Sequence, residues 1–261
     1  MTIPETTPPA STTTSPVEAI DRALVVLEAL ARGGAQGVQL ADLAAGLGLN
    51  KTTVHRSLAA LRFRGFASQD PVTGAYLLGA AAVALGDRFL SEDNLPALLH
   101  PALLALSAAS GELVHLGVLS GTHIVYLDKV EPERSVRVYS AVGRRNPAAT
   151  TALGRALLAA RGTDRGSLRG YTTDLADGVE ERAWHALEAA RERGYAVEER
   201  ENEPDISCVA VALVRGGQPV AAVSITAPAE RMSPERVDEL HSLIRSTLPD
   251  LLPGGLGLGE G

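Results

Sequence analysis

Two short helical patterns joined by a glycine constrain the fold of this chain more than any other feature of its sequence. Residues 40–47 and 51–64 carry apolar side chains at helical spacing, and Gly48 lies between them. Asn50 precedes the second pattern as a helix cap, and Gly65 follows it as a terminator. Two helices joined through a tight, glycine-containing turn predict a helix-turn-helix.

The flanking residues extend this prediction to a winged helix-turn-helix over residues 16–79. Ser15 as a cap and Pro16 at the first helical position predict a helix before the two short ones. Residues 66–69 and 75–78 are typical of short strands, and the Pro and Gly between them predict a turn. This strand pair would form the wing.

The rest of the chain divides by composition. Residues 1–15, rich in Thr, Ser and Pro, predict a disordered tail. An alanine-rich stretch within residues 80–93 predicts a linker helix, and residues 94–250 predict a second domain. The glycine-rich residues 251–261 predict a flexible tail.

The second domain is predicted to be α+β with an antiparallel sheet. Its expected helices are 96–110, 151–160, 179–193 and 234–248. Its expected strands are 113–119, 123–130, 135–142, 195–198, 208–214 and 220–226. The run from Cys208 to Val214 is apolar at every position, which indicates a strand covered on both faces and a buried Cys208.

The net charge of −7 conceals a local excess of positive charge. Residues 1–90 are balanced, and residues 91–261 supply the whole negative charge. The segment between Asp42 and Asp70 has no acidic residue and contains Lys51, His55, Arg56, Arg62 and Arg64. Such a patch in an acidic protein is typical of a phosphate-binding surface, although a solvated helix face has the same composition.

Helical spacing divides the 51–64 segment into two faces. The face expected to point into the core carries Val54, Leu58 and Leu61. The opposite face carries Thr52, Thr53 and Arg56. Arginine pairs with guanine and threonine contacts base edges, so this face is suited to reading DNA in the major groove. The alternative is an ordinary amphipathic helix.

Four further residues around this face are suited to the phosphate backbone rather than to the bases. Lys51 and His55 flank the reading face, and Arg62 and Arg64 lie toward the far end of the helix and the wing. Their contacts would position the protein on double-stranded DNA without reading its sequence.

Several classes of protein are excluded by what the sequence lacks. A single cysteine rules out a disulfide framework or a multi-cysteine metal site, and it favours a reducing, cytoplasmic setting. No apolar run approaches the ~20 residues that cross a membrane, and no leader segment is present. The six histidines show no metal-ligand spacing, and phosphate-loop and dinucleotide signatures are missing. We therefore expect no cofactor, no metal and no enzymatic activity.

Several stretches of the sequence, taken together, resemble the isocitrate lyase regulator (IclR) family of bacterial transcription factors. They are LGLNKTTVHR (47–56), RGF (64–66), QDPVTGAYLLG (69–79), TALGRALLA (151–159), GYAV (194–197) and CVA (208–210). The resemblance covers residues 17–248. It implies a winged helix-turn-helix, a linker helix and a C-terminal GAF-like α+β domain that binds a small effector.

The resemblance also implies a mode of action. Members of the family regulate metabolic operons, often as repressors, and bind near-palindromic operators as homodimers or dimers of dimers. A ligand in the effector domain would shift the placement of the two DNA-reading domains through the linker helix, which requires different affinities for the two arrangements.

Carried over position by position, the family's effector pocket falls on Ala152, Leu153, Glu198, Ile206, Cys208, Ser224 and Thr226. Three positions depart from the residues common in the family: Ala149 in place of His, Glu198 in place of Asp, and Asp205 in place of Gly. Glu198 opposes a bare carboxylate but accepts hydrogen bonds from amide, ureido or hydroxyl groups. Ser224 and Thr226 donate to carbonyl or carboxylate oxygens, which favours an organic acid, such as a hydroxy acid, or a ureide.

Two alternatives keep the same fold. Cys208 could act as a redox switch, which requires an accessible thiol of low pKa. The effector domain could instead turn over its ligand around Cys208 or Glu198, although no base is expected beside the thiol.

Overall fold

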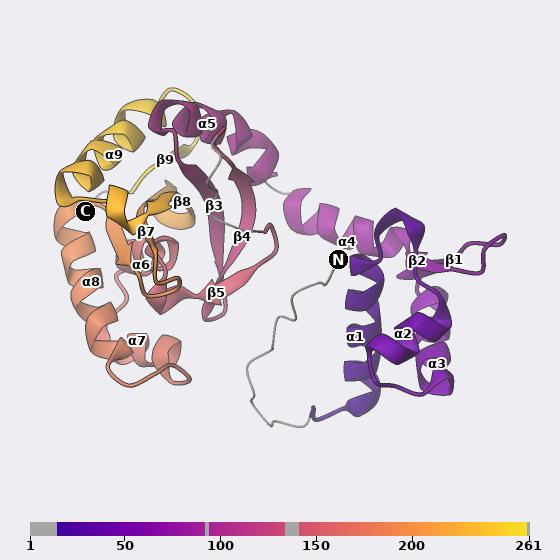
Figure 1. Ribbon diagram of the computed structural model, residues 1–261. Helices are drawn as coiled ribbons and strands as arrows, with labels where there is room; N and C mark the ends of the chain where they lie inside the picture. The colour runs from indigo at the N-terminus through magenta and orange to yellow at the C-terminus, as the bar shows by residue number, and fades with distance from the viewer. Residues whose placement is uncertain (1–14, 92–93, 134–140, 260–261) are drawn as a thin grey trace. The chain divides into compact units, whose positions relative to one another are not determined.

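The computed structural model describes residues 15–91, 94–133 and 141–259 of the chain (Figure 1). The chain forms two compact units, residues 1–92 and 93–261.

The first unit is a helical bundle with a two-stranded wing (Figure 1). Its elements are α1 (Glu18–Arg32), η1 (Gly34–Gln36), α2 (Leu40–Gly46), α3 (Lys51–Phe63), β1 (Ala67–Gln69), β2 (Tyr76–Leu78) and α4 (Ala80–Ser91). Its core is formed by Val26, Leu30, Leu43, Ala44, Val54, Leu58, Leu61, Ala67 and Tyr76. The apolar face expected for the 51–64 segment is thus the buried face of α3.

The ends of α3 follow from its flanking residues. The Asn50 side chain accepts a hydrogen bond of 2.8 Å from the backbone N–H of Thr53, which caps the first turn. Gly65 adopts φ of +74°, in the left-handed region that ends helices and favours glycine.

The expected start of α1 was wrong by two residues. Neither Ser15 nor Pro16 begins the helix; Val17 is the N-cap, and its carbonyl accepts the first helical hydrogen bonds from Ile20 and Asp21. Glu18 and Asp21 lie in the first turn, where negative charge complements the helix dipole.

The second unit is an antiparallel sheet with helices on both faces. Its strands are β3 (Leu113–Ser120), β4 (His123–Val130), β5 (Arg145–Pro147), β6 (Ala196–Glu199), β7 (Ile206–Arg215), β8 (Gln218–Pro228) and β9 (Leu256–Leu258). Its helices are α5 (Leu95–Ser110), η2 (Ala148–Thr150), α6 (Ala152–Ala160), α7 (Arg165–Thr172), α8 (Val179–Arg193), η3 (Ala229–Arg231) and α9 (Pro234–Thr247). The strand order is β5-β4-β3-β8-β7-β6, and β9 pairs with β7. The α+β fold with an antiparallel sheet is therefore confirmed.

Alternation along β7 and β8 places large and small side chains on opposite faces of the sheet. Val209, Val211, Val223 and Ile225 belong to the core shared with α5 and α9. The other face packs against α6, α7 and α8 and carries Ala210, Ala212 and Ala222. The apolar run 208–214 within β7 is thus covered on both faces, as expected, but Cys208 itself is half-buried rather than buried.

Three expectations for this unit need correction. The glycine-rich tail is not wholly irregular, because Leu256–Leu258 forms β9 against residues 213–215. This pairing satisfies backbone groups on the edge of β7 that β6 leaves free. The expected 135–142 strand falls mainly on residues outside the described ones, and its residues 141 and 142 are not in a strand. Helix α7 was not expected; Asp164 caps it.

Candidate functional site

A cavity opens between the start of α6 and the sheet of the second unit. Its volume is about 50 Å³, enough for a few waters or a small ligand. Its lining residues are His115, Tyr126, Arg144, Asn146, Thr151, Ala152, Leu153, Glu198, Asn202, Glu203, Ile206, Cys208, Ser224 and Thr226.

The cavity exists because small side chains occupy the α6 face of β7 and β8. Cys208 is the register partner of Thr226, and Ala210 is the register partner of Ser224. Ser224 and Thr226 are both buried, at 2% and 3% exposure. Branched apolar residues fill the opposite face of the sheet. On the α6 face, by contrast, these short polar side chains leave space and supply hydrogen-bonding groups.

Glu198 is the buried acidic group of the cavity. Its side chain is 2% exposed, and its Oε1 accepts hydrogen bonds from the backbone N–H groups of Glu201 (2.6 Å) and Asn202 (3.3 Å). Burial raises the pKa of Glu198, and the two backbone N–H groups oppose that shift. Its carboxyl group can accept further hydrogen bonds from a ligand's N–H or O–H groups.

The remaining interior groups are neutral. Burial lowers the pKa of His115 to about 3 and raises the pKa of Tyr126 to about 12. Burial also raises the pKa of the Cys208 thiol, with the negative charge of Glu198 as a second cause. The Thr226 hydroxyl lies 3.3 Å from Nδ1 of His115, so hydroxyl, imidazole and thiol form a connected polar strip.

An ion pair lies on the lining of the cavity. Nη2 of Arg144 donates to Oε1 of Glu203 at 3.1 Å, and the side chains are 39% and 49% exposed. Arg144 directly precedes β5, and Glu203 belongs to the loop between β6 and β7. Nearby, Nδ2 of Asn146 donates to the Tyr126 hydroxyl at 3.3 Å.

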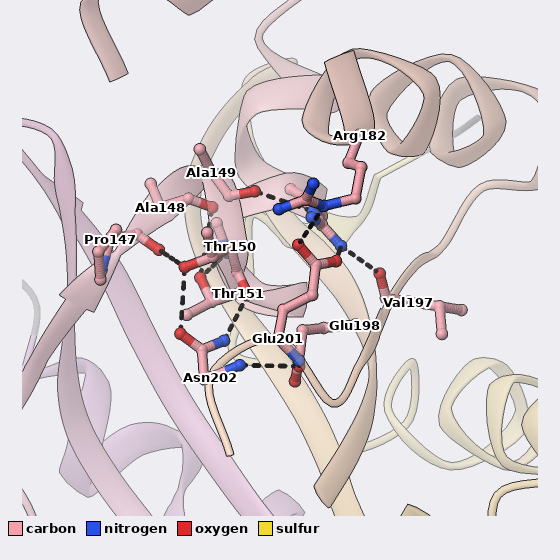
Figure 2. Close-up of polar contacts among 12 residues, drawn as sticks. Pro147, Ala148, Ala149, Thr150, Thr151, Arg182, Val197, Glu198, Glu201 and Asn202 are labelled. Carbon is pink, nitrogen blue, oxygen red and sulfur yellow. Dashed lines mark hydrogen bonds and ion pairs between the residues drawn. The ribbon is translucent and has the colours of Figure 1, made fainter. Parts of the chain in front are cut away.

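The loop between β6 and β7 is anchored to the start of α6 by polar contacts, many of which Figure 2 draws. The Thr150 hydroxyl donates to Oδ1 of Asn202 at 3.1 Å, and Nδ2 of Asn202 donates back to the Thr150 carbonyl. Nη1 of Arg155 lies 2.7 Å from Oε1 of Glu201, with the Arg155 side chain only 3% exposed. These contacts hold one wall of the cavity in place.

The cavity brings together all seven residues that the sequence singled out for the effector pocket: Ala152, Leu153, Glu198, Ile206, Cys208, Ser224 and Thr226. Sequence reasoning missed the other seven: His115, Tyr126, Arg144, Asn146, Thr151, Asn202 and Glu203. His115 carries a detectable signal, since it is a polar residue within an apolar strand. Arg144, Asn202 and Glu203 come from connecting segments, where side-chain periodicity gives no information.

The expected DNA-reading face of α3 is largely exposed. Lys51, Thr52, His55 and Arg56 are exposed, whereas Thr53 is half-buried. Thr53 therefore departs from the expected position opposite the core. Its side chain lines a groove between α1 and α3.

The two arginines toward the wing have local partners. Nη1 of Arg62 donates to Oε1 of Gln69 on β1 at 3.0 Å, which ties α3 to the wing. The Arg64 guanidinium lies 5.3 Å from the centre of the Phe63 ring. Both arginines are exposed and keep free N–H groups for an anion.

The turn of the wing is held by Asp70. Its Oδ1 accepts hydrogen bonds from the backbone N–H groups of Thr73 (2.7 Å) and Val72 (2.8 Å), and the pKa of Asp70 is lowered as a result. Gly74 adopts φ of +73°, which closes the turn. Val72 is 91% exposed at the tip.

Within the described parts of the chain, no group of three or more His, Cys, Asp or Glu side chains is placed to hold a metal ion. Among the described helices, none combines the length and apolar content needed to cross a bilayer.

Family models match both units. The model described as the IclR helix-turn-helix domain matches residues 19–71, and the bacterial transcriptional regulator IclR C-terminal model matches residues 87–251.

Relatives and solved structures agree with these matches. The chain is 34% identical to the glycerol operon regulatory protein of Streptomyces coelicolor, over 91% of this chain and 98% of that protein. It is 32% identical to the acetate operon repressor of Salmonella typhimurium, over 90% of each. The crystal structure of Thermotoga maritima IclR matches at a TM-score of 0.68 and 26% identity, over 89% of this chain and 96% of that one. The crystal structure of an IclR transcriptional regulator from Alicyclobacillus acidocaldarius matches at a TM-score of 0.66 and 29% identity, over 90% of this chain and 97% of that one.

The winged helix-turn-helix, the helix-covered antiparallel sheet and the matches over both units lead to one conclusion. This chain belongs to the IclR family of transcriptional regulators.

Proposed function

We propose that the chain is a ligand-responsive repressor of a catabolic or metabolic operon. In this proposal a homodimer, or a dimer of dimers, binds a near-palindromic operator, and a small polar metabolite in the cavity of the second unit changes the affinity for DNA. The relatives named as an acetate operon repressor and a glycerol operon regulatory protein support the regulatory part.

One observation carries the ligand-responsive part. The seven residues that the family resemblance assigns to an effector line a single cavity, with buried polar groups on its walls. Buried polar groups normally have hydrogen-bond partners, so a pocket of this kind favours a polar ligand over an apolar one. Glu198 accepts from N–H or O–H groups, and Ser224 and Thr226 donate to oxygens.

The DNA-binding part rests on the exposed face of α3. Arg56 and Thr52 are proposed to read base edges, with Thr53 at the border of that face. Lys51, His55, Arg62 and Arg64 are proposed to contact phosphates. Two such helices in a dimer would enter successive major grooves, about 34 Å apart.

An enzymatic role has little support in the cavity. The His115 imidazole is linked to Cys208 through the Thr226 hydroxyl, and both His115 and the thiol are held in their neutral forms. A nucleophilic thiol requires an adjacent base or a lowered pKa.

The experiment that tests the proposed function selects duplexes from a random-sequence library with the full-length protein. We expect enrichment of an inverted repeat, and we expect glycolate or N-carbamoylglycine to change retention of the selected duplex. The Thr226→Val variant should select the same repeat but lose the response, whereas Thr173→Val, at the end of α7, should keep it. Failure to enrich any sequence would contradict the regulator proposal.

A further inference from the structure

The Arg144–Glu203 ion pair joins two segments of the cavity wall that are far apart in sequence. Arg144 comes from the segment before β5 and Glu203 from the loop after β6. Their 3.1 Å contact uses one guanidinium nitrogen and one carboxylate oxygen. Both side chains line the cavity and remain partly exposed, so the pair lies at its mouth rather than in its interior.

Charge is unevenly distributed along this cavity. Among its lining residues in the described structure, Arg144 is the one Lys or Arg side chain, and burial keeps His115 neutral. The interior holds Glu198, at 2% exposure. Among the lining residues, the positive charge is therefore that of Arg144 at the mouth. The Glu198 carboxyl group in the interior accepts hydrogen bonds but repels anions.

We propose that Arg144 is the recognition group for the carboxylate of an anionic effector, and that this carboxylate displaces Glu203 from the guanidinium. The effector is then a small carboxylic acid that also carries N–H or O–H donors. Its carboxylate binds Arg144 at the mouth, and its donors point inward to Glu198. This inference rests on the proposed function and names the chemical class of the ligand.

The exchange is favourable because the existing pair is weak. Ion pairs exposed to solvent contribute little, since water screens the charges and two long side chains lose freedom. A ligand carboxylate can instead receive two parallel N–H bonds from one guanidinium. Glu203 thus holds Arg144 in place without blocking it, and it discriminates against ligands that lack a negative charge.

The test compares acids with their amides. Binding of glycolate, glycolamide, N-carbamoylglycine and N-carbamoylglycinamide to the full-length protein is measured by calorimetry for wild type, Arg144→Gln and Glu203→Gln. Arg145→Gln and Glu199→Gln are the matched controls, because these neighbours are exposed and do not line the cavity.

We expect wild type to bind at least one acid about tenfold more tightly than its amide, as a charged hydrogen-bonded contact provides. Arg144→Gln should abolish that preference, Glu203→Gln should strengthen acid binding, and the controls should match wild type. Equal binding of acid and amide by wild type, or an acid preference that survives Arg144→Gln, would overturn the role of Arg144 but leave the effector cavity in place. Absence of binding by all four probes would also overturn it, while the duplex selection would still decide the regulator proposal.

Discussion

Sγ of Cys208 lies 3.2 Å from Oγ1 of Thr226, across the register that pairs β7 with β8. The thiol therefore faces the cavity from the middle of the sheet rather than from a loop or a helix terminus. Burial is the largest cause of the raised pKa of this thiol, and the negative charge of Glu198 is the second; together they outweigh the hydrogen bond with the Thr226 hydroxyl, which favours the thiolate. A redox-sensing cysteine needs a stabilised thiolate, which this environment does not favour.

We expect the Cys208 thiol to react slowly in the native protein. Its raised pKa leaves little thiolate at neutral pH, and the thiolate is the reactive form. Labelling with a thiol-specific disulfide reagent at pH 8 should be much slower for the native protein than for the protein in urea, and Cys208→Ser should bind DNA as wild type does. Rapid labelling accompanied by release of DNA would favour the redox alternative.

The sequence was informative where local chemistry decides structure. Asn50 and Gly65 set the ends of α3 within one residue, because a cap and a left-handed glycine act on their own turn of helix. Strands β3, β4, β6, β7 and β8 could be found from the sequence, whereas the short strands β5 and β9 were missed. The start of α1 was placed too early, because Ser15 and Pro16 have the residue types of a helix start. In the folded chain the N-cap is Val17 instead.

The lining of the cavity was only partly predictable, because local spacing fixes the residues on its strands but not those that come from connecting segments. Ser224 and Thr226 are two residues apart in β8, so the sequence places their side chains on one face of the sheet, whereas Cys208 was assigned to the pocket through the family resemblance. Arg144 and Glu203 meet because connecting segments distant in sequence converge in space. Strand β9 was missed because its stability comes from a free sheet edge, which is a tertiary feature.

Arg56 and Lys51 are predicted to contribute differently to DNA binding. Arg56→Ala should cost about 1–3 kcal/mol on the selected duplex and relax preference at one base pair, because it removes a base contact. Lys51→Ala should weaken binding to all duplexes alike, because it removes a phosphate contact. It should also reduce the slope of log affinity against log salt concentration by about 1. Fluorescence anisotropy over a salt series measures both effects. Arg161→Ala, exposed after α6 in the second unit, is the control, and equal losses on selected and random duplexes for both variants would contradict these roles.

Gly154 is predicted to be essential for the cavity wall. A Cβ at this position would lie 2.1 Å from the carbonyl oxygen of Ala148, a backbone atom that cannot move aside cheaply. Gly154→Ala should therefore destabilise the second unit by at least about 2 kcal/mol, as overpacking of a core does. Urea unfolding followed by the fluorescence of Trp184, the single tryptophan, reports on this unit. Gly170→Ala in α7 meets nothing within 4 Å and should be neutral or slightly stabilising; a similar loss for both variants would argue against the steric explanation.

His115 is predicted to make the second unit sensitive to acid. Burial lowers its pKa from 6.5 to about 3, so between these values the unfolded chain binds a proton that the folded chain does not. The stability from the neutral, buried imidazole is fully present above pH 6.5 and is lost as the pH falls toward 3. Wild type should thus lose more stability than His115→Asn between pH 7 and pH 4.5, in urea unfolding followed by Trp184 fluorescence. His123→Asn, near the start of β4, should behave as wild type does. An equal loss for wild type and His115→Asn would show that other groups govern acid unfolding, since only the variant lacks the buried imidazole.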